Sequence, residues 1–499
     1  MEQKNRFSNL LERLIATADV KHYVLAQCLQ FDVSYISKWV SGRVLPSEKT
    51  AVDTLQKLSK CIVENASDSG NAQLLRDYLV PNNNELWQAI YDNLIAEYYY
   101  VQELQQNSGN VVAPNVSFYA ELSMKKFLSK MHHPVLRRVK SLNIMAAMDL
   151  FSMADEYRPK IVSLGGEQNA LHNYPDVHFS LLINLDKAEQ DIIHNTLFIT
   201  NILIDLARVD FSLYQGDFSH GKVVFVVKED FAISGMLIRR DNCACVSVCE
   251  GSEYSLPLYN DIQTLCTREA LLFRKMEMHE MLNTSMEYMY FLLAPERCWI
   301  LGHITEHLLP KEVFDELLES PAIAQKNFSK EALLNLHKLS NAVFAQGETK
   351  LLVSNSAFSR LVVSGEVDFF NERLTLNFRQ RIKVLEYLCR VWEYANDTNT
   401  RMIRDPLVAD FHYSTIPSMF LSGTVSYLRL NVANQSNNLL LNINGQAMQN
   451  VYKKFFAEVW NNENQVVSDR EQIRSYLEHL LHGLRIMNEL EEQKNQVSE

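Results

Sequence analysis

A short segment beyond the middle of the chain has residue types that could hold a metal ion. His303, Glu306 and His307 have the spacing H-x-x-E-H. On a helix the two histidines would lie on one face and could bind zinc, while the glutamate could activate a bound water for hydrolysis. The pattern rests on these three residues, and no third ligand can be picked out. A solvated helix end is the simpler interpretation, so we predict neither a metal site nor a catalytic residue here.

Three cysteines form a second candidate, because thiolates bind soft metals. Cys243, Cys245 and Cys249 lack the C-x-x-C spacing of common metal and redox sites. Strand alternation would place Cys243 and Cys245, and with them Cys249, on one face, where cysteine behaves as a small apolar residue. Eight cysteines in 499 residues are too few for a disulfide scaffold. We therefore predict a reducing, cytoplasmic location.

A His-x-Lys pair, His220 and Lys222, lies in the segment FSHGKVVFVVKEDFAISGML (residues 218–237). This segment resembles a degenerate form of the phospholipase D signature. The resemblance implies that His220 stands at the nucleophile position and that Lys222 binds phosphate. Val227 stands where that family has an aspartate, and no second His-x-Lys follows, although the family's phosphodiester chemistry needs two. We expect a non-catalytic version in which both residues are candidate ligand-binding groups; two ordinary strands are the alternative.

The first 65 residues have the periodicity of four short helices. Apolar residues recur at helical spacing from Phe7 to Ile15, and a second helix is expected over 21–30. Asp32 is placed to cap a third helix over 33–40, which Ser41-Gly42 would end. A fourth helix should follow Pro46. Four short helices with tight connections would form a small helical module.

The segment LAQCLQFDVSYISKWVSGRVLP, residues 25–46, resembles the helix-turn-helix of the Cro and phage-repressor (XRE-type) family. The resemblance covers about residues 7–63. Its register is matched by Leu25-Ala26, Leu29, Ile36-Ser37, Trp39, Gly42 and Pro46. Gln30 replaces the usual turn glycine, which would cost about 1 kcal/mol if that residue is left-handed. The alternative is a small helical bundle that contacts only protein.

The resemblance implies that the third helix enters the major groove of DNA. Ile36 and Trp39 would anchor this helix to the core. The residues expected to contact DNA are His22, Val33, Ser34, Ser37, Lys38 and Arg43. The serines can hydrogen-bond base edges and the valine can contact a thymine methyl group. The basic residues would contact phosphates, which supply affinity and orientation but little sequence information.

Charge is distributed unevenly along the chain. Residues 1–65 contain nine Lys/Arg and seven Asp/Glu, so the head carries about +2, while the whole chain carries −12. A small DNA-reading head on an acidic body fits this division, and the overall charge argues against coating of nucleic acid by the whole molecule. No run of eighteen apolar residues occurs, and the N-terminal residues do not resemble a signal peptide, so we predict no membrane partner.

Strand and helix patterns alternate from about residue 175, which is typical of an α/β or α+β body. Among the expected elements are a strand over 360–365 and a helix over 253–276. Two segments, 246–265 and 439–459, each combine a strand, a short loop and a helix, with Tyr259 and Tyr452 at equivalent places. This similarity predicts a duplicated body.

The predicted fold is multi-domain. Its parts are an all-α helix-turn-helix head (1–66), a helical connector (67–160), a large α/β or α+β body (161–465) and a C-terminal helix (466–499). The resemblance of residues 218–237 to the phospholipase D signature and the similarity between 246–265 and 439–459 make a duplicated phospholipase D-like fold a candidate for the body. The C-terminal helix, with its apolar stripe, packs on the body or pairs with a second copy.

The predicted function is a transcriptional regulator that binds double-stranded DNA in a sequence-specific manner as a homodimer. Its body would sense a small-molecule or peptide effector and use no cofactor. The alternative is an enzyme or defence-type effector, a zinc-dependent hydrolase or phosphodiesterase-like protein, with a DNA-targeting head. A scaffold that binds protein partners through the connector is a third possibility. Sequence-specific DNA binding would distinguish the first hypothesis from the third.

Overall fold

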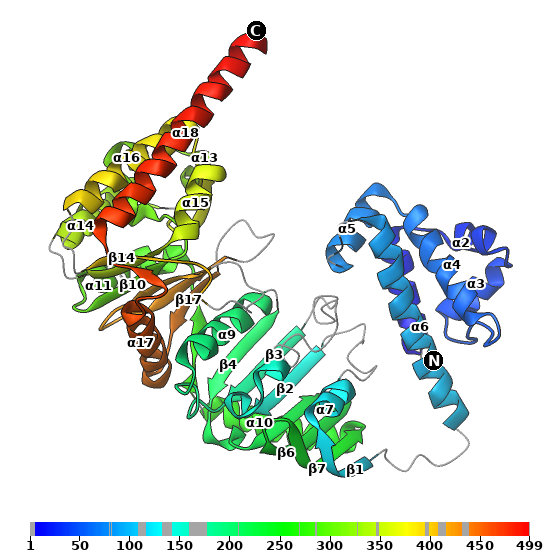
Figure 1. Ribbon diagram of the computed structural model, residues 1–499. Helices are drawn as coiled ribbons and strands as arrows, with labels where there is room; N and C mark the ends of the chain where they lie inside the picture. Colours follow the sequence, from blue (N-terminus) through cyan, green and yellow to red (C-terminus); the bar gives the residue numbers. More distant parts are fainter. Residues whose placement is uncertain are drawn as a thin grey trace. The chain divides into compact units, whose positions relative to one another are not determined.

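The computed structural model in Figure 1 shows a helical N-terminal part followed by two mixed sheets with helices packed on them. It describes residues 5–498 except 79, 81, 108–115, 132–141, 159–176, 208, 269, 285–286, 327, 346–348, 395–398, 408–415 and 432–438. The chain forms two compact units. The first comprises residues 1–184 and 208–269, and the second comprises residues 185–207 and 270–499.

Six helices form the N-terminal part of the first unit. They are α1 (Arg6–Ala18), α2 (His22–Leu29), α3 (Val33–Val40), α4 (Ala51–Glu64), α5 (Asp68–Tyr78) and α6 (Asn83–Asn107). The sequence predicts α1 to α4 and ends the head at residue 66. The structure differs, because α5 and α6 share the apolar core that begins at Phe7 and extends to Val101. Their apolar faces need cover, and the four shorter helices provide it.

The first sheet has the strand order β1-β7-β6-β5-β2-β3-β4-β8. Its strands are β1 (Val116–Ser123), β2 (Leu142–Met148), β3 (Val177–Ile183), β4 (Asp210–Gln215), β5 (Lys222–Val227), β6 (Phe231–Arg239), β7 (Asn242–Glu250) and β8 (Ala270–Leu271). β2, β3 and β4 are parallel, while β5, β6, β7 and β1 continue antiparallel. β1 and β2 lie within 67–160, so the prediction of a wholly helical connector is wrong.

Short helices accompany the first sheet. They are α7 (Met124–Met131) and α10 (Ser252–Arg268), with short 3-10 turns at Leu150–Ser152, Asp155–Tyr157 and Asp217–Ser219. Ile262 of α10 packs in one apolar cluster with Met145 of β2 and Val226 of β5. The predicted helix over 253–276 therefore ends early, at Arg268, and the chain continues into strands β8 and β9 (Phe273–Lys275).

The second sheet has the strand order β18-β14-β11-β10-β15-β16-β17-β9. Its remaining strands are β10 (Arg297–Leu301), β11 (Thr349–Ser354), β14 (Thr400–Ile403), β15 (Ser418–Leu421), β16 (Tyr427–Leu430), β17 (Leu439–Ile443) and β18 (Val466–Val467), and a separate hairpin joins β12 (Glu366–Phe369) to β13 (Glu372–Thr375). β10, β11 and β14 are parallel, and the strands from β15 to β9 alternate in direction.

The two sheets have the same topology. Taken from β1 in the first sheet and from β9 in the second, the strand orders correspond one to one. In each sheet three central strands are parallel and four neighbours on one side are antiparallel. The helix after β7 is α10 and the helix after β17 is α17 (Gln446–Asn461). The body is therefore mixed α/β, and its strand order repeats, as the segments around Tyr259 and Tyr452 predict.

The remaining described helices belong to the second unit. They are α9 (Ile192–Asp205), α11 (Glu287–Leu293), α12 (Lys311–Leu318), α13 (Pro321–Ala324), α14 (Lys330–Ala345), α15 (Asn355–Val363), α16 (Phe378–Tyr394), α17 and α18 (Arg470–Ser498), with a π-helical turn at Glu280–Thr284 and a 3-10 turn at Glu306–Leu308. α9 contacts α17, and α16 contacts α18; Figure 1 shows α16 beside the long helix α18. None of the described helices is both long and apolar enough to cross a membrane.

One predicted strand of the body is a helix. Residues 360–365, RLVVSG, have the β-branched composition of a strand, but α15 continues to Val363. Ser354 caps this helix, because its hydroxyl accepts a hydrogen bond from the Ser356 amide at 3.1 Å. Phe358 and Leu361 are buried on one face of the helix. Tertiary packing overrides the local strand preference here.

Candidate nucleic-acid interface

The pair of helices α2 and α3 is held together by small and apolar side chains. Ala26 is 1% exposed where α2 meets α3, and Leu25 is fully buried beside it. From α3, Ile36 and Trp39 enter the same core, and the Trp39 ring lies edge-on to Phe31 with centroids 5.5 Å apart. The predicted anchoring of the third helix by Ile36 and Trp39 is confirmed.

Both ends of α3 are defined by local interactions. The Asp32 carboxylate accepts a hydrogen bond from the Ser34 amide at 2.9 Å, as predicted for a capping residue. Hydrogen bonds from the Ser34 side chain and amide hold the pKa of Asp32 below its usual range. At the other end Gly42 has φ 78°, and a Cβ there would lie 3.1 Å from the Ser8 hydroxyl. Helix α3 therefore begins and ends where the sequence predicts.

The turn between α2 and α3 is left-handed at Gln30, with φ 59°. This is the position where the helix-turn-helix families commonly have glycine. A side chain with a Cβ makes this conformation less favourable by about 1 kcal/mol. The turn keeps its shape because the flanking core residues Leu29 and Ile36 are buried on either side.

The outward face of α3 carries the residues that the sequence assigns to base contacts. Val33, Ser34, Ser37 and Lys38 are all exposed. Tyr35 lies among them at 47% exposure and is not one of the contacts that the sequence predicts. The sequence could have indicated it, because a helix that buries Ile36 and Trp39 directs the residue before Ile36 toward the outward face. The face thus combines hydroxyl, aliphatic, aromatic and cationic groups, which suits contacts to base edges.

Basic side chains flank this face. Lys38 is exposed, and its Nζ lies 5.5 Å from the centre of the Tyr35 ring. Arg43 follows the end of α3 and is exposed, while His22 at the start of α2 is half-buried. These residues therefore lie at α3, just beyond it, and at the start of the helix that packs against it, which suits contacts to phosphates on either side of a groove.

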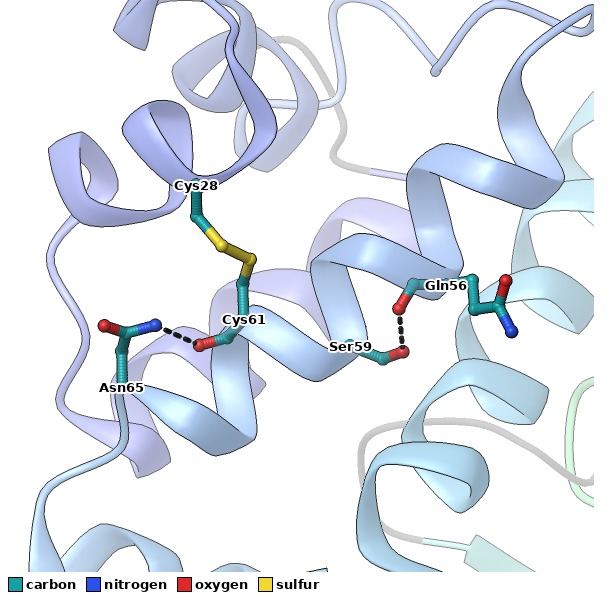
Figure 2. The surroundings of a disulfide bond; sticks show 5 residues. All are labelled: Cys28, Gln56, Ser59, Cys61 and Asn65. Carbon is teal, nitrogen blue, oxygen red and sulfur yellow. Dashed lines mark hydrogen bonds between the residues drawn. A yellow bond between two sulfur atoms is a disulfide. The ribbon is translucent and has the colours of Figure 1, made fainter. Parts of the chain in front are cut away.

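A disulfide between Cys28 and Cys61 joins α2 to α4 (Figure 2). The two Cα atoms are 6.4 Å apart, and the sequence separation is 33 residues. The number of cysteines in the chain does not indicate this bond, and the predicted reducing location, which rests on that number, does not account for it. A cross-link closing a loop of this length stabilises a fold by about 3 to 4 kcal/mol through the entropy of the unfolded chain. The bond therefore links the helix that supports α3 to the core of the head.

The His-x-Lys pair lies at the edge of the first sheet where β2 and β3 end. His220 is exposed, and its Nδ1 lies 3.1 Å from the Asn184 amide nitrogen and 3.9 Å from an Asp149 carboxylate oxygen. That same oxygen accepts a hydrogen bond from the Gly221 amide at 2.8 Å. Lys222 is directed elsewhere, with its Nζ 3.7 Å from the centre of the Phe218 ring. The two predicted ligand-binding residues thus have separate partners.

The H-x-x-E-H segment does not form a helix with two histidines on one face. His303 lies in the loop after β10, and Glu306 and His307 lie in a 3-10 turn. Arg429 donates to both Glu306 carboxylate oxygens, at 2.6 and 2.9 Å, and the Tyr288 hydroxyl donates to one of them at 2.6 Å. The carboxylate is thereby occupied by a guanidinium and cannot act as a base on a metal-bound water.

This segment is also fully buried, so the interpretation as a solvated helix end is wrong. Burial raises the pKa of Glu306, but the charge of Arg429 outweighs it and holds the pKa at about 2. Burial lowers the pKa of His303 to about 3 and that of His307 to about 4. His307 Nδ1 lies 2.7 Å from the Ser340 hydroxyl. Among the described residues, no group of three or more His, Cys, Asp or Glu side chains could hold a metal ion.

The three cysteines of β7 do not share one face. The register between β6 and β7 shifts between the pairs Ser234–Ser247 and Met236–Ala244, which is a β-bulge at Cys245. Cys243 is buried near Gly235, and the apolar surroundings raise the pKa of its thiol to about 12. Cys249 pairs with Ala232, which faces α10. The extra residue in the bulge reverses the alternation, which the spacing alone does not show.

Comparison with protein-family models and with curated proteins finds no match to this chain.

Proposed function

We propose that the chain is a sequence-specific DNA-binding transcriptional regulator that reads base edges with α3. The observation that carries the proposal is the division of α3 into two faces. Ile36 and Trp39 are buried in the head, while Ser34, Ser37 and Lys38 are exposed beside them. In a helix-turn-helix module this face contacts bases in the major groove of double-stranded DNA.

The proposal includes a division of roles between side chains. Ser34 and Ser37 donate to or accept from base edges, Val33 contacts a thymine methyl group, and His22, Lys38 and Arg43 bind phosphates. Two copies of the chain bind two half-sites, because modules of this kind read DNA with two-fold symmetry. The α/β body assembles this dimer and senses an effector that favours one arrangement of the heads.

The test is binding of the purified full chain to the DNA upstream of its own gene, compared with a scrambled duplex over a series of salt concentrations. The wild-type chain should prefer its own DNA by about a thousandfold or more, and both affinities should weaken as salt rises. The double variant Ser34→Ala, Ser37→Ala should lose about tenfold or more of that preference while keeping its affinity for the scrambled duplex.

Two lysine variants complete the experiment. Lys38→Ala should weaken binding to both duplexes alike and make the salt dependence shallower by about one phosphate contact. Lys57→Ala is the matched control, since Lys57 is an exposed lysine of the same head that pairs with Asp53 on α4 at 2.8 Å. It should leave both affinities unchanged. Equal binding of the two duplexes at every salt concentration would refute the proposal.

A further inference from the structure

A pocket of about 250 Å³ lies in the second unit, between the second sheet and the C-terminal half of α17. Its apolar walls are Leu421 of β15 with Phe456 and Trp460 of α17, and Cys298 of β10 is the half-buried thiol on its sheet side. Two cationic side chains, Lys350 of β11 and Lys453 of α17, line it from opposite elements. The lining thus combines apolar walls with two cationic side chains, a combination that small-molecule sites commonly have.

The positive charge of the pocket exceeds its negative charge. Glu296 is the one carboxylate among the lining residues, against the ammonium groups of Lys350 and Lys453. Burial raises the pKa of the Cys298 thiol, Lys350 and Lys453 both oppose that rise, and the carboxylate of Glu296 adds to it. An anion placed near Cys298 would therefore be within the field of both ammonium groups.

The aromatic wall is held in place from outside the pocket. The Arg401 guanidinium of β14 lies 4.2 Å from the centre of the Trp460 ring and donates a 2.6 Å hydrogen bond to the Trp460 carbonyl. Lys350 Nζ lies 5.7 Å from the same ring. These contacts restrain the ring before any ligand binds, and a preorganised wall reduces the entropy lost on binding.

The first sheet provides an internal comparison. When the carboxyl ends of β2 and β10 are aligned, Cys298 corresponds to Met145, and its neighbour Lys350 corresponds to Ser180. When Tyr452 of α17 is aligned with Tyr259 of α10, Lys453 corresponds to Asn260 and Trp460 to Thr267. At the equivalent place in the first sheet, the side chains of Met145, Val226 and Cys266 form part of an apolar cluster. The two lysines and the tryptophan thus distinguish the second half of the body from the first.

We propose that this pocket binds a small organic anion. Its phosphate or carboxylate group would lie between Lys350 and Lys453, and its apolar body or ring would pack on Leu421 and Phe456. The inference deepens the proposed function by giving the chemical class of the effector, and it rests on that function only for the regulatory role. Binding itself is measured on the full chain without DNA, so its failure and the failure of DNA recognition are distinguishable.

The experiment measures alkylation of Cys298 by N-ethylmaleimide, quantified by mass spectrometry of the peptide that contains it. Phenyl phosphate and benzoate are the anionic probes, and phenol is the neutral probe of the same ring. Both anions should slow the alkylation of Cys298 in a saturable manner, phenol should not, and Cys389 in α16 should react at the same rate throughout. If phosphate alone or carboxylate alone protects, the result identifies the anionic group.

The double variant Lys350→Met, Lys453→Met keeps the apolar stems and removes both charges. It should raise the concentration of phenyl phosphate needed for half-protection by about tenfold or more, because hydrogen bonds to charged groups are lost. Lys454→Met is the matched control, since Lys454 lies next along α17 and forms an ion pair with Glu189. Isothermal titration of phenyl phosphate into the three proteins gives a second measure. Equal effects of phenol and phenyl phosphate, no protection by any probe, or equal protection in the double variant would overturn the proposal.

Discussion

The two sheets of the body have the same strand order and directions, but at one equivalent interior position they have opposite kinds of residue. With the carboxyl ends of β2 and β10 aligned, the paired strands place Gly235 of β6 where β16 has Arg429. A Cβ at Gly235 would lie 3.0 Å from Val246 and 3.5 Å from Phe127 of α7. Arg429 instead extends a guanidinium to Glu306 and Asp368. One topology thus accommodates either close apolar packing or a buried ionic network.

The difference shows which part of the sequence each half depends on. Backbone pairing needs only a suitable alternation of apolar residues, which both halves provide. In the first half, Val246 and Phe127 pack closely against Gly235, which has no side chain, so additional volume there is unfavourable. The second half buries Arg429, Glu306 and Asp368, so any change that leaves one charge without a partner is unfavourable. The two halves should therefore respond oppositely to changes in charge and in volume.

Removing one charge of the network should have the largest effect. Glu306→Gln keeps the shape of the side chain but removes one of the two carboxylate charges that pair with the Arg429 guanidinium. We expect the second unit to lose about 3 to 5 kcal/mol of its free energy of unfolding. Hydrogen–deuterium exchange of peptides from β10 and β11 measures this loss, and peptides from β2 and β3 should be unaffected.

The matched control for this variant is Glu312→Gln. Glu312 is an exposed carboxylate of α12, 3.0 Å from Lys383, in the same unit. Its replacement should change the free energy of unfolding by less than about 0.5 kcal/mol. Similar losses in the two variants would contradict a special role for the buried network.

Acid should destabilise the second unit next most strongly. His303 and His307 have folded pKa values of about 3 and about 4, below the ordinary value of 6.5. At pH values between 6.5 and these lower folded values, the unfolded chain binds more protons than the folded chain. The free energy of unfolding is therefore highest above pH 6.5, and it falls progressively as the pH drops from 6.5 through 4. One such histidine accounts for about 3 kcal/mol.

The measurement is peptide-resolved unfolding in urea at a series of pH values, with peptides of both sheets followed in one sample. A His307→Phe variant should flatten the pH dependence of the second unit between pH 6.5 and 4. If the second unit were equally stable over that range in the wild-type chain, the buried neutral state of these histidines would be disproved.

Adding a methyl group in the first half should have the smallest effect of the three. Gly235→Ala brings a Cβ within 3.0 Å of Val246, in a position with little free space. We expect a loss of about 1 to 2 kcal/mol for the first sheet, measured by exchange of peptides from β5 and β6. Gly483→Ala on α18 is the control, because nothing lies within 4 Å of its new Cβ. That variant should gain about 0.5 to 1 kcal/mol, and a gain at Gly235 as well would remove the contrast between the two halves.

Local patterns were sufficient for the first four helices of the head and for much of the body. The spacing of Phe7, Ile36 and Trp39, together with the cap at Asp32, predicts α1 to α4 and the outward face of α3, because these features depend on residues close in sequence. The similarity between the segments around Tyr259 and Tyr452 predicts a duplicated body. Ser34, Ser37 and Lys38 are exposed as expected, while their contacts with DNA stay a prediction.

Other features depend on partners that are distant in the chain. The sequence suggests a helix end or a zinc site at His303, Glu306 and His307, because their neighbours in space, Arg429 and Tyr288, lie elsewhere in the sequence. Likewise, the bulge at Cys245 and the helical state of residues 360–365 depend on contacts with other strands and helices.

The amino-acid sequence by itself determined the first four helices of the head, the acidic character of the rest of the chain and the alternation of strands and helices in the body. These properties follow from local periodicity, capping and composition. Only the tertiary structure decided that α5 and α6 belong to the head, that Cys28 meets Cys61, and that Lys350 and Lys453 line one pocket. The physical reason is that each of these features is a contact between elements, and whether a polar or charged group is buried and paired depends on what the fold brings beside it.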